Sequence, residues 1–583
     1  MKFDLTRRRI GAGIVTASLA AAAVAGTGLS MTANGADAAK FTGVVLGVGV
    51  TESSRTLAWY SSTNPTGGEN VELATKADFS DKTVVRATLK ANVTTEGLAV
   101  AAANGKVLLS DLKAKTQYYY RIVEDGTSNV SKTYEFSTGE FGNGDFQFLF
   151  FGDPQIGSSG TADADAVADG DGWQYTLAQS RIHSPKAELY VSGGDQINNA
   201  NREVEWDNFL RPSELTSIPW AATIGNHDVG GYGYEQHFAL PTTVDRNGSL
   251  YKTPASTTTT SGGDYYYTYK GVLFIDLNSN AYSTANGSDD AHLAFVRNTI
   301  KNHKGKAQHV VLVYHHSIYS PADHANDTDN QQRRLDFTKA FSDLGVDLVL
   351  QGHDHSYSRS YALKGTAAGQ DAVKANAAEQ PGASTVVEGP GGVIYVTANS
   401  ASGSKYYDLT EPDATKAGYG PDTLTGGPET AGHTRHWANS VENQEHVPTY
   451  IQVTVNDKGL QVKNIRSGDD TSPNPALRKG NVTGFGPNLA GVAAPIGSVQ
   501  DQVDIFRDQS DVTKIKDPKG EVTTVTKTET KTVTKEVVPA KLKNQVATKI
   551  AQLTKQIKKA KGTKKKTLKA QLAAYKAVQA SLK

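Results

Sequence analysis

The chain has 583 residues, more than the about 250–300 that one hydrophobic core usually reaches, so at least two folded domains are expected. Its composition, 38% hydrophobic and 21% charged with no cysteine, argues against wholesale disorder and excludes disulfides, thiolate metal ligands and cysteine nucleophiles. The net charge of zero is uneven, because residues 541–583 hold 13 lysines and no Asp, Glu or Arg, so the rest of the chain is acidic and is not expected to bind nucleic acid specifically.

The first 38 residues have the features of an export signal. Three arginines, Arg7 to Arg9, precede a weakly apolar stretch over 10–29, and Ala36-Asp37-Ala38 provides a small-residue cleavage site. The arginines fit either the twin-arginine route or the general secretory route. A retained membrane anchor is less favoured, because Gly and Thr interrupt the apolar stretch. We therefore expect a secreted or cell-surface protein.

Residues 41–140 are expected to form a β-sandwich. Short alternating runs such as 56–60 and 118–123 are separated by Gly, Asn, Asp and Pro, which is typical of antiparallel strands joined by turns. The stretch LSDLKAKTQYYYRI resembles a fibronectin type III domain, in which a turn leads into an aromatic-rich strand. The aromatic residues are assigned to packing rather than to ligand binding.

Residues 145–470 are expected to form an α/β domain in which two β-sheets are flanked by helices. Strongly apolar runs alternate with helical segments, and the later runs at 392–398 and 449–455 are assigned to a second sheet layer. The earlier predicted strands are 146–151, 188–192, 219–224, 272–277, 309–314 and 346–350.

The remainder of the chain differs in amino-acid composition from the two predicted domains. Residues 471–540 are assigned to an irregular region and a Thr-rich linker. Residues 541–583 carry apolar side chains at helical spacing on either side of Gly562, so a short helical hairpin with a cationic exterior is expected. This tail is either a solvated terminal structure or a binding element for an anionic cell-wall or membrane surface.

Five of the predicted strands are followed by loops rich in metal-ligand residues. Ligand sites in open α/β sheets lie just outside the carboxyl ends of the strands, so the five loops can meet in one crevice. Carboxylate, amide and imidazole ligands without thiolates suit a pair of first-row ions, iron with zinc or manganese, that together activate a bridging hydroxide. The loops are GDPQ (Asp153), GGDQ (Asp195), GNHD (Asn226, His227), YHHS (His315, His316) and QGHDH (His353, His355).

The order of these motifs resembles that of the calcineurin-like metallophosphoesterase superfamily, and more closely its purple acid phosphatase branch. The resemblance covers about residues 41–467 and includes the stretches SGGDYYYTYKGVLFIDLNS and YVTANSASGSKYYD, together with the preceding fibronectin-like domain. It implies that Asp153 and His355 bind the first metal, that Asp195 bridges, and that Asn226, His315 and His353 bind the second.

The resemblance also implies roles beside the metals. His227 is expected to face the substrate phosphate, and His324, nine residues after His315, stands where relatives often place a histidine near the leaving group. The histidine that commonly follows it is Ala325 here, which weakens a proton-donor role for His324. His316 is expected to be a neighbour of His315 rather than a ligand. The spacing of His433, His436 and His446 marks no site, so structural or surface positions are expected for them.

Two positions depart from the pattern of relatives. Gln155 stands two residues after Asp153, where many members of the superfamily have histidine. Asn198 stands three residues after Asp195, where purple acid phosphatases have the tyrosinate that gives them their colour. A purple ferric centre is therefore not expected.

The sequence favours an exported hydrolase of phosphomonoesters, related to acid phosphatases, that uses a metal-bridging hydroxide. A phosphodiesterase that acts on nucleotides, lipid headgroups or wall polymers is an alternative within the same fold. A surface binding protein with a vestigial hydrolase domain is an alternative of another class, but all six ligand positions are filled. The expected partner is a phosphate ester substrate.

Overall fold

The computed structural model describes residues 40–93 except 63, 65 and 66, then 101–242, 263–280, 288–409 except 408, 436–468 and 495–515, and four positions between 551 and 558. The expected export signal (1–38), nearly all of the lysine-rich tail and His433 lie outside the described residues. No helix within the described ranges combines the length and the apolar composition that a membrane crossing requires.

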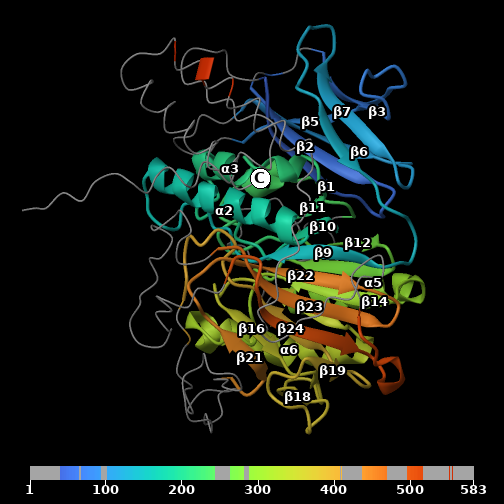
Figure 1. Ribbon diagram of the computed structural model, residues 1–583, viewed down its shortest axis with the longest axis vertical. Helices are drawn as coiled ribbons and strands as arrows, with labels where there is room; N and C mark the ends of the chain where they lie inside the picture. Colours follow the sequence, from blue (N-terminus) through green and yellow to red (C-terminus); the bar gives the residue numbers. More distant parts are fainter. Residues whose placement is uncertain are drawn as a thin grey trace, which may run out of the picture. The chain divides into compact units, whose positions relative to one another are not determined.

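The N-terminal domain is a two-sheet sandwich, as predicted (blue in Figure 1). One sheet has the strand order β4-β3-β7-β8, and the facing strands follow the order β1-β2-β6-β5. A separate core of buried side chains, including Leu57, Trp59 and Tyr120, fills the space between them. The strands are β1 (Phe41–Val48), β2 (Arg55–Ser61), β3 (Glu69–Ala74), β4 (Thr83–Arg86), β5 (Thr88–Ala91), β6 (Ala103–Leu109), β7 (Gln117–Glu124) and β8 (Tyr134–Ser137).

The second domain is built on two stacked sheets flanked by helices, which confirms the predicted fold class. The first sheet continues from the sandwich and has the order β19-β24-β23-β22-β9-β10-β11-β1-β2-β6-β5. Its strands outside the sandwich are β9 (Phe146–Phe151), β10 (Ala187–Ser192), β11 (Trp220–Ala221), β19 (Thr385–Val387), β22 (Thr449–Val455), β23 (Gly459–Arg466) and β24 (Val499–Phe506).

The second sheet has the order β12-β13-β14-β15-β20-β16-β21, and β17 and β18 form a separate ribbon. The strands β13, β14, β15 and β20 pair in parallel. The pairs β12–β13, β20–β16 and β16–β21 are antiparallel. The strands are β12 (Tyr265–Tyr269), β13 (Val272–Leu277), β14 (His309–Tyr314), β15 (Leu348–Gln351), β16 (Tyr357–Ser360), β20 (Ile394–Thr397) and β21 (Asn439–Asn443), with β17 (Leu363–Lys364) and β18 (Val373–Lys374) in the ribbon.

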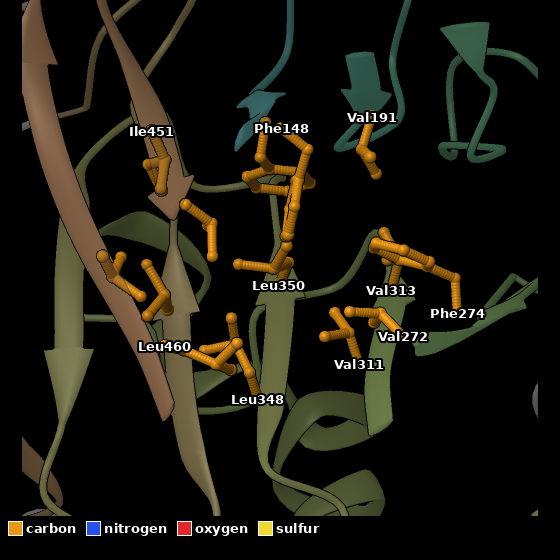
Figure 2. Close-up of a cluster of buried hydrophobic side chains, with 14 of the residues drawn as sticks. Phe148, Val191, Val272, Phe274, Val311, Val313, Leu348, Leu350, Ile451 and Leu460 are labelled. Atoms are coloured by element: carbon orange, nitrogen blue, oxygen red, sulfur yellow. The ribbon is translucent and has the colours of Figure 1, made fainter. Parts of the chain in front are cut away.

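Side-chain alternation along the strands separates the layers. Phe148 and Phe150 of β9 point into the core between the two sheets, whereas Leu149 and Phe151 join a second core beneath helices α2 (Asp163–His183) and α3 (Glu203–Phe209). Figure 2 shows the inter-sheet core, in which Phe148 and Ile451 of the first sheet face Leu350 of the second. Helices α5 (Ser288–His303) and α6 (Thr328–Leu344) cover the outer face of the second sheet.

The described helices connect or follow strands, and the three longest, α2, α5 and α6, have 21, 16 and 17 residues. The α-helices are α2 (Asp163–His183), α3 (Glu203–Phe209), α4 (Gly233–His237), α5 (Ser288–His303) and α6 (Thr328–Leu344), and the 3-10 helices are η1 (Ser213–Thr216), η2 (Lys304–Lys306), η3 (Asp323–Asn326) and η5 (Gln509–Asp511).

Two sequence-based assignments need correction. The strands predicted at 392–398 and 449–455 do not share a layer, because β20 pairs with β15 in the second sheet whereas β22 pairs with β9 in the first. The assignment of 471–540 to an irregular region is also wrong in part, since β24 lies within it and pairs with β23. Asp501 of β24 is bound by Arg359 of β16, which anchors this strand through a charge that local sequence patterns do not indicate.

Candidate metal centre

The five ligand loops predicted from the sequence follow parallel strands of the two sheets. Asp153, Asp195 and Asn226 come after β9, β10 and β11 of the first sheet. His315 and His353 come after β14 and β15 of the second sheet, and His355 lies two residues farther on. Because parallel strands end on the same side of a sheet, both groups of loops open toward one region between the sheets.

His315 lies at the centre of the predicted second metal site. Its Nε2 atom is 2.9 Å from Asn226 Oδ1, 3.1 Å from His353 Nδ1 and 3.3 Å from Asp195 Oδ2. Its other nitrogen, Nδ1, is 2.8 Å from the carbonyl of Gly193. A carbonyl only accepts hydrogen bonds, so Nδ1 must donate, and Nε2 is then the atom that can bind a metal.

The predicted first site joins Asp153 to His355. His355 Nε2 is 3.3 Å from Asp153 Oδ2, and its Nδ1 faces the carbonyl of Lys405 at 3.0 Å, which again leaves Nε2 for a metal. The Asp153 carboxylate also accepts the His353 backbone N–H at 2.9 and 2.8 Å. Asp153, Asp195, His315 and His355 are almost completely buried, which limits access of water to this cluster.

The backbone at the site adopts conformations that most residues avoid. Asp195, His353 and His355 have φ angles of 46°, 75° and 43°, in the left-handed region where side chains other than those of glycine are disfavoured. Such conformations cluster at functional sites, where the surrounding structure holds them against their cost. Three of the six predicted ligands are therefore held in strained loops.

Two motif glycines are required because ligand side chains pack against them. A Cβ atom on Gly225, which precedes Asn226, would collide with the Asp195 carboxylate. A Cβ atom on Gly352, which precedes His353, would collide with the Asp153 carboxylate. The glycine in GNHD thus allows two loops of the first sheet to approach each other, and the glycine in QGHDH allows a loop of the second sheet to approach one of the first.

Charges within the cluster shift its ionisation. Burial raises the pKa of Asp153, the charge of His315 opposes this, and Asp195 adds to it. Burial alone would raise the pKa of Asp195, but the influence of His315 and His227 outweighs it and holds that pKa below its ordinary value. Burial alone would lower the pKa of His315, but the carboxylates of Asp195 and Asp153 outweigh it and raise that pKa to about 9. Without a metal His315 is therefore protonated, and metal binding has to displace that proton.

Two further aspartates hold the ligand loops in place, and the sequence analysis did not assign them. Asp228 accepts the backbone N–H groups of Gly225 at 2.8 Å and Gln196 at 3.1 Å, so it joins the second and third loops. Asp354 accepts those of Ala322 and His324 at 3.0 and 3.1 Å. Burial raises the pKa of both carboxyls, which fits a structural role. Their position inside the GNHD and QGHDH motifs is the signal that could have found them.

His227 and His324 both lie beside the cluster. The His227 backbone N–H donates to Asp195 Oδ1 at 2.9 Å, and its ring Nδ1 is 2.7 Å from the carbonyl of Asn198, which leaves Nε2 free of that contact. The His324 ring stacks on that of His353 with centroids 3.9 Å apart. His324 Nδ1 is 2.7 Å from Asp327 Oδ2, so Asp327 provides a partner even though Ala325 replaces the histidine common in relatives.

The two departures from relatives lie side by side. Gln155 Nε2 donates to Asn198 Oδ1 at 3.2 Å, and Gln155 also has a left-handed φ of 35°. Two of the nearby tyrosines are engaged elsewhere: Tyr234 donates its hydroxyl to the carbonyl of Ala222, Tyr357 donates to Asp501, and burial raises the pKa of both.

Two of the histidines not assigned as ligands have structural surroundings. His316 Nδ1 is 2.8 Å from Ser279 Oγ, and burial lowers the pKa of this histidine well below its ordinary value. Arg334 contacts buried His436 at 2.7 Å. The positions of these two side chains agree with the neighbour and structural roles expected for them.

Lys405 and Tyr407, which belong to the stretch YVTANSASGSKYYD, also lie at the cluster. The Tyr407 ring centroid is 5.4 Å from those of His324 and His355, with its plane nearly perpendicular to both. Lys405 Nζ lies 4.3 Å from the Tyr407 ring centroid. No motif identifies these residues, since their proximity depends on how the segment after β20 folds back.

Comparison with known proteins assigns the two domains. A calcineurin-like phosphoesterase profile matches residues 146–357, and a purple acid phosphatase N-terminal domain profile matches residues 42–138. The chain joins a purple acid phosphatase N-terminal domain to a calcineurin-like phosphoesterase domain. The residues matched by the first profile include all six predicted ligands.

Individual relatives are distant. An uncharacterized protein of Mycobacterium tuberculosis is 25% identical over 350 residues, which are 55% of this chain and 63% of that protein. Purple acid phosphatase 1 of Ipomoea batatas is 25% identical and phosphoenolpyruvate phosphatase of Allium cepa 24%, each covering 44% of this chain and 52% and 50% of the relative. This chain thus spans between half and two thirds of the length of these relatives.

Among solved structures, purple acid phosphatase PPD1 from yellow lupin (Lupinus luteus) has a TM-score of 0.57 at 15% identity, and the match covers 81% of this chain and 75% of that one. This similarity supports the fold.

Proposed function

We propose that this protein is an exported metal-dependent phosphatase that hydrolyses phosphomonoesters. The observation that carries the proposal is the convergence of Asp195, Asn226, His315 and His353 around one point, with the Asp153–His355 pair as the second half of the site. Family membership supports the reaction class, and the names of the plant relatives support monoesters.

The donor set fits two metal ions. Asp153 and His355 would hold the first ion, Asp195 would bridge, and Asn226, His315 and His353 would hold the second. Asp195, His315 and His353 offer ligand atoms that lie within 4.8 Å of one another. Imidazole, carboxylate and amide ligands without thiolate suit iron with zinc or manganese. The chemistry that such a pair supplies is a hydroxide nucleophile and positive charge against the phosphoryl oxygens.

The chain's own residues would bind the phosphate and move protons. His227 Nε2 is positioned to donate to a phosphoryl oxygen, because Nδ1 is already engaged by Asn198. His324 Nε2 is positioned to protonate the leaving oxygen, because Asp327 engages Nδ1 and orients the ring. Replacement of Asp327 by Asn should lower turnover more for alkyl phosphates, whose leaving groups need protonation, than for p-nitrophenyl phosphate.

The test of the function is hydrolysis by purified full-length protein loaded with iron, zinc or manganese. Monoesters and bis-esters with the same leaving group, p-nitrophenyl phosphate and bis-p-nitrophenyl phosphate, are compared under the same conditions. The proposal expects metal-dependent turnover with a higher kcat/KM on the monoester. A higher kcat/KM on the diester would instead identify a phosphodiesterase, and no turnover with any metal pair would contradict both.

Export is proposed from the N-terminal sequence alone. The Arg7 to Arg9 cluster, the weakly apolar stretch and the Ala36-Asp37-Ala38 site support it. Detection of the mature protein with a new N-terminus near residue 39 outside the membrane would agree with export, whereas an intact N-terminus on protein retained inside the cell would contradict it.

A further inference from the structure

We propose that Lys405 and Tyr407 form a leaving-group subsite that selects phosphomonoesters whose leaving group combines a planar portion with a negative charge. This inference rests on the proposed function, because it assigns a direction to the substrate in the same site.

The segment that carries both residues is fixed to a predicted metal ligand. The Lys405 carbonyl accepts from the His355 ring at 3.0 Å. Gln444, which is completely buried, donates to the carbonyls of both His355 at 2.7 Å and Tyr407 at 2.6 Å. Lys405 and Tyr407 are therefore held at a defined position beside the metal centre.

The Tyr407 ring contacts one predicted metal ligand and the histidine expected at the leaving group. It stands nearly perpendicular to His355, a predicted ligand of the first metal, and to His324, the histidine expected at the leaving group. A phosphate placed over the metals with its leaving oxygen at His324 would direct the rest of the leaving group toward Tyr407. A half-buried aromatic ring at that position offers stacking to a planar group.

Lys405 adds a cation next to this ring. Its Nζ lies over the Tyr407 ring, and among the described residues it has no carboxylate within ion-pair distance. The acidic groups that act on it electrostatically are Asp195, Asp153, Asp323 and Asp354. The first two are predicted metal ligands, and Asp354 already accepts two backbone N–H groups.

The Lys405 side chain is half-buried, so part of the hydration of its ammonium group is lost, and no described carboxylate forms an ion pair with it. A partly buried charge gains from an opposite charge that arrives with the substrate. A carboxylate or a second phosphoryl group on the leaving group supplies that charge.

The experiment compares two esters that share a phenyl leaving group, phenyl phosphate and 4-carboxyphenyl phosphate. Full-length metal-loaded protein is expected to prefer the carboxylate ester in kcat/KM, and Lys405→Met is expected to reduce that preference about tenfold. Lys405→Arg should retain the preference, because it keeps the charge, whereas Tyr407→Leu should weaken both esters alike. Lys364→Met, at an exposed lysine of β17, is the matched control and should leave the preference unchanged.

Equilibrium binding separates this inference from the proposed function. Calorimetry with benzylphosphonate and 4-carboxybenzylphosphonate, which cannot be hydrolysed at the P–C bond, measures the same discrimination without turnover. A Lys405-dependent preference in binding supports the subsite even if no ester is hydrolysed. Equal losses for both ligands in Lys405→Met, or an unchanged preference, would overturn it.

Discussion

Replacement of Asp195 by Asn tests the assignment of the bridging ligand most directly. The carboxylate is 2% exposed, accepts the His227 N–H at 2.9 Å and lies 3.3 Å from His315 Nε2. An amide keeps the shape and can still accept from His227, but it loses the charge that the two ions and His315 require. The fold should survive, because burial and, after it, the charge of Asp195 raise the pKa of nearby Asp228, and the amide removes that repulsion.

The expected effect on function is large. Loss of a residue that merely orients a ligand costs about 10–100-fold in metal affinity, so loss of the bridging ligand itself should cost at least that. Turnover should fall by roughly 10³-fold or more, comparable to the loss of a transition-state contact. In wild-type protein, a metal at one hundred times its Kd stabilises the fold by about 2.7 kcal/mol, and most of this metal-dependent gain should disappear in the variant.

The assay combines kcat/KM on p-nitrophenyl phosphate, bound metal per chain, and thermal unfolding with and without metal. Asp276→Asn is the matched control, because Asp276 is equally buried and accepts from Thr223 but is not a predicted metal ligand, and burial raises its pKa. Asp195→Asn protein that binds two ions and turns over within tenfold of wild type would refute the bridging assignment.

Three further outcomes are expected. Metal-loaded active protein should lack the intense visible charge-transfer band of purple phosphatases, because Asn198 cannot supply a phenolate; an absorption spectrum checks this, and a band that a tyrosine substitution removes would contradict it. Gly352→Ala should lower metal content at least tenfold in elemental analysis, since its Cβ displaces the Asp153 carboxylate; full occupancy would refute that packing argument. Asp501→Asn should cost about 3–5 kcal/mol in denaturant unfolding, because it leaves Arg359 buried without its partner. Burial alone would raise the pKa of Asp501, but Arg359 outweighs it and lowers that pKa. The stability difference between wild type and Asp501→Asn is therefore present above the ordinary Asp pKa and should vanish as pH falls through the pKa of Asp501 in the folded protein. A stability difference that does not depend on pH would contradict this pairing.

The sequence predicts those parts of the fold that local patterns determine. The runs at 146–151, 272–277, 309–314 and 449–455 match β9, β13, β14 and β22 residue for residue, because they are rich in the β-branched and aromatic residues that favour strands. Their distribution between the sheets was not predictable, since strand pairing depends on contacts between residues hundreds of positions apart. The pairing of β24 with β23 was missed for the same reason, and its sequence VQDQVDIF has too few apolar residues to stand out.

The candidate site divides in the same way. The six ligand positions follow strands in recognisable motifs, and the structure brings all of them together. Asp327, Lys405 and Tyr407 belong to no motif, and they reach the site because η3 and the segment after β20 fold over it. Residues that hold or surround a reacting group are set by tertiary packing, whereas the ligands themselves recur in short patterns.

The continuity of the first sheet gives the N-terminal domain a protective role. β1 pairs in parallel with β11, a strand of two residues that leads into the loop carrying Asn226 and His227. In a protein without the N-terminal domain, β11 would become an edge strand with unpaired backbone groups that could pair with other chains. The sandwich strands therefore cover the edge of β11, and we expect the phosphoesterase domain without its neighbour to be more prone to pair with other chains through this strand.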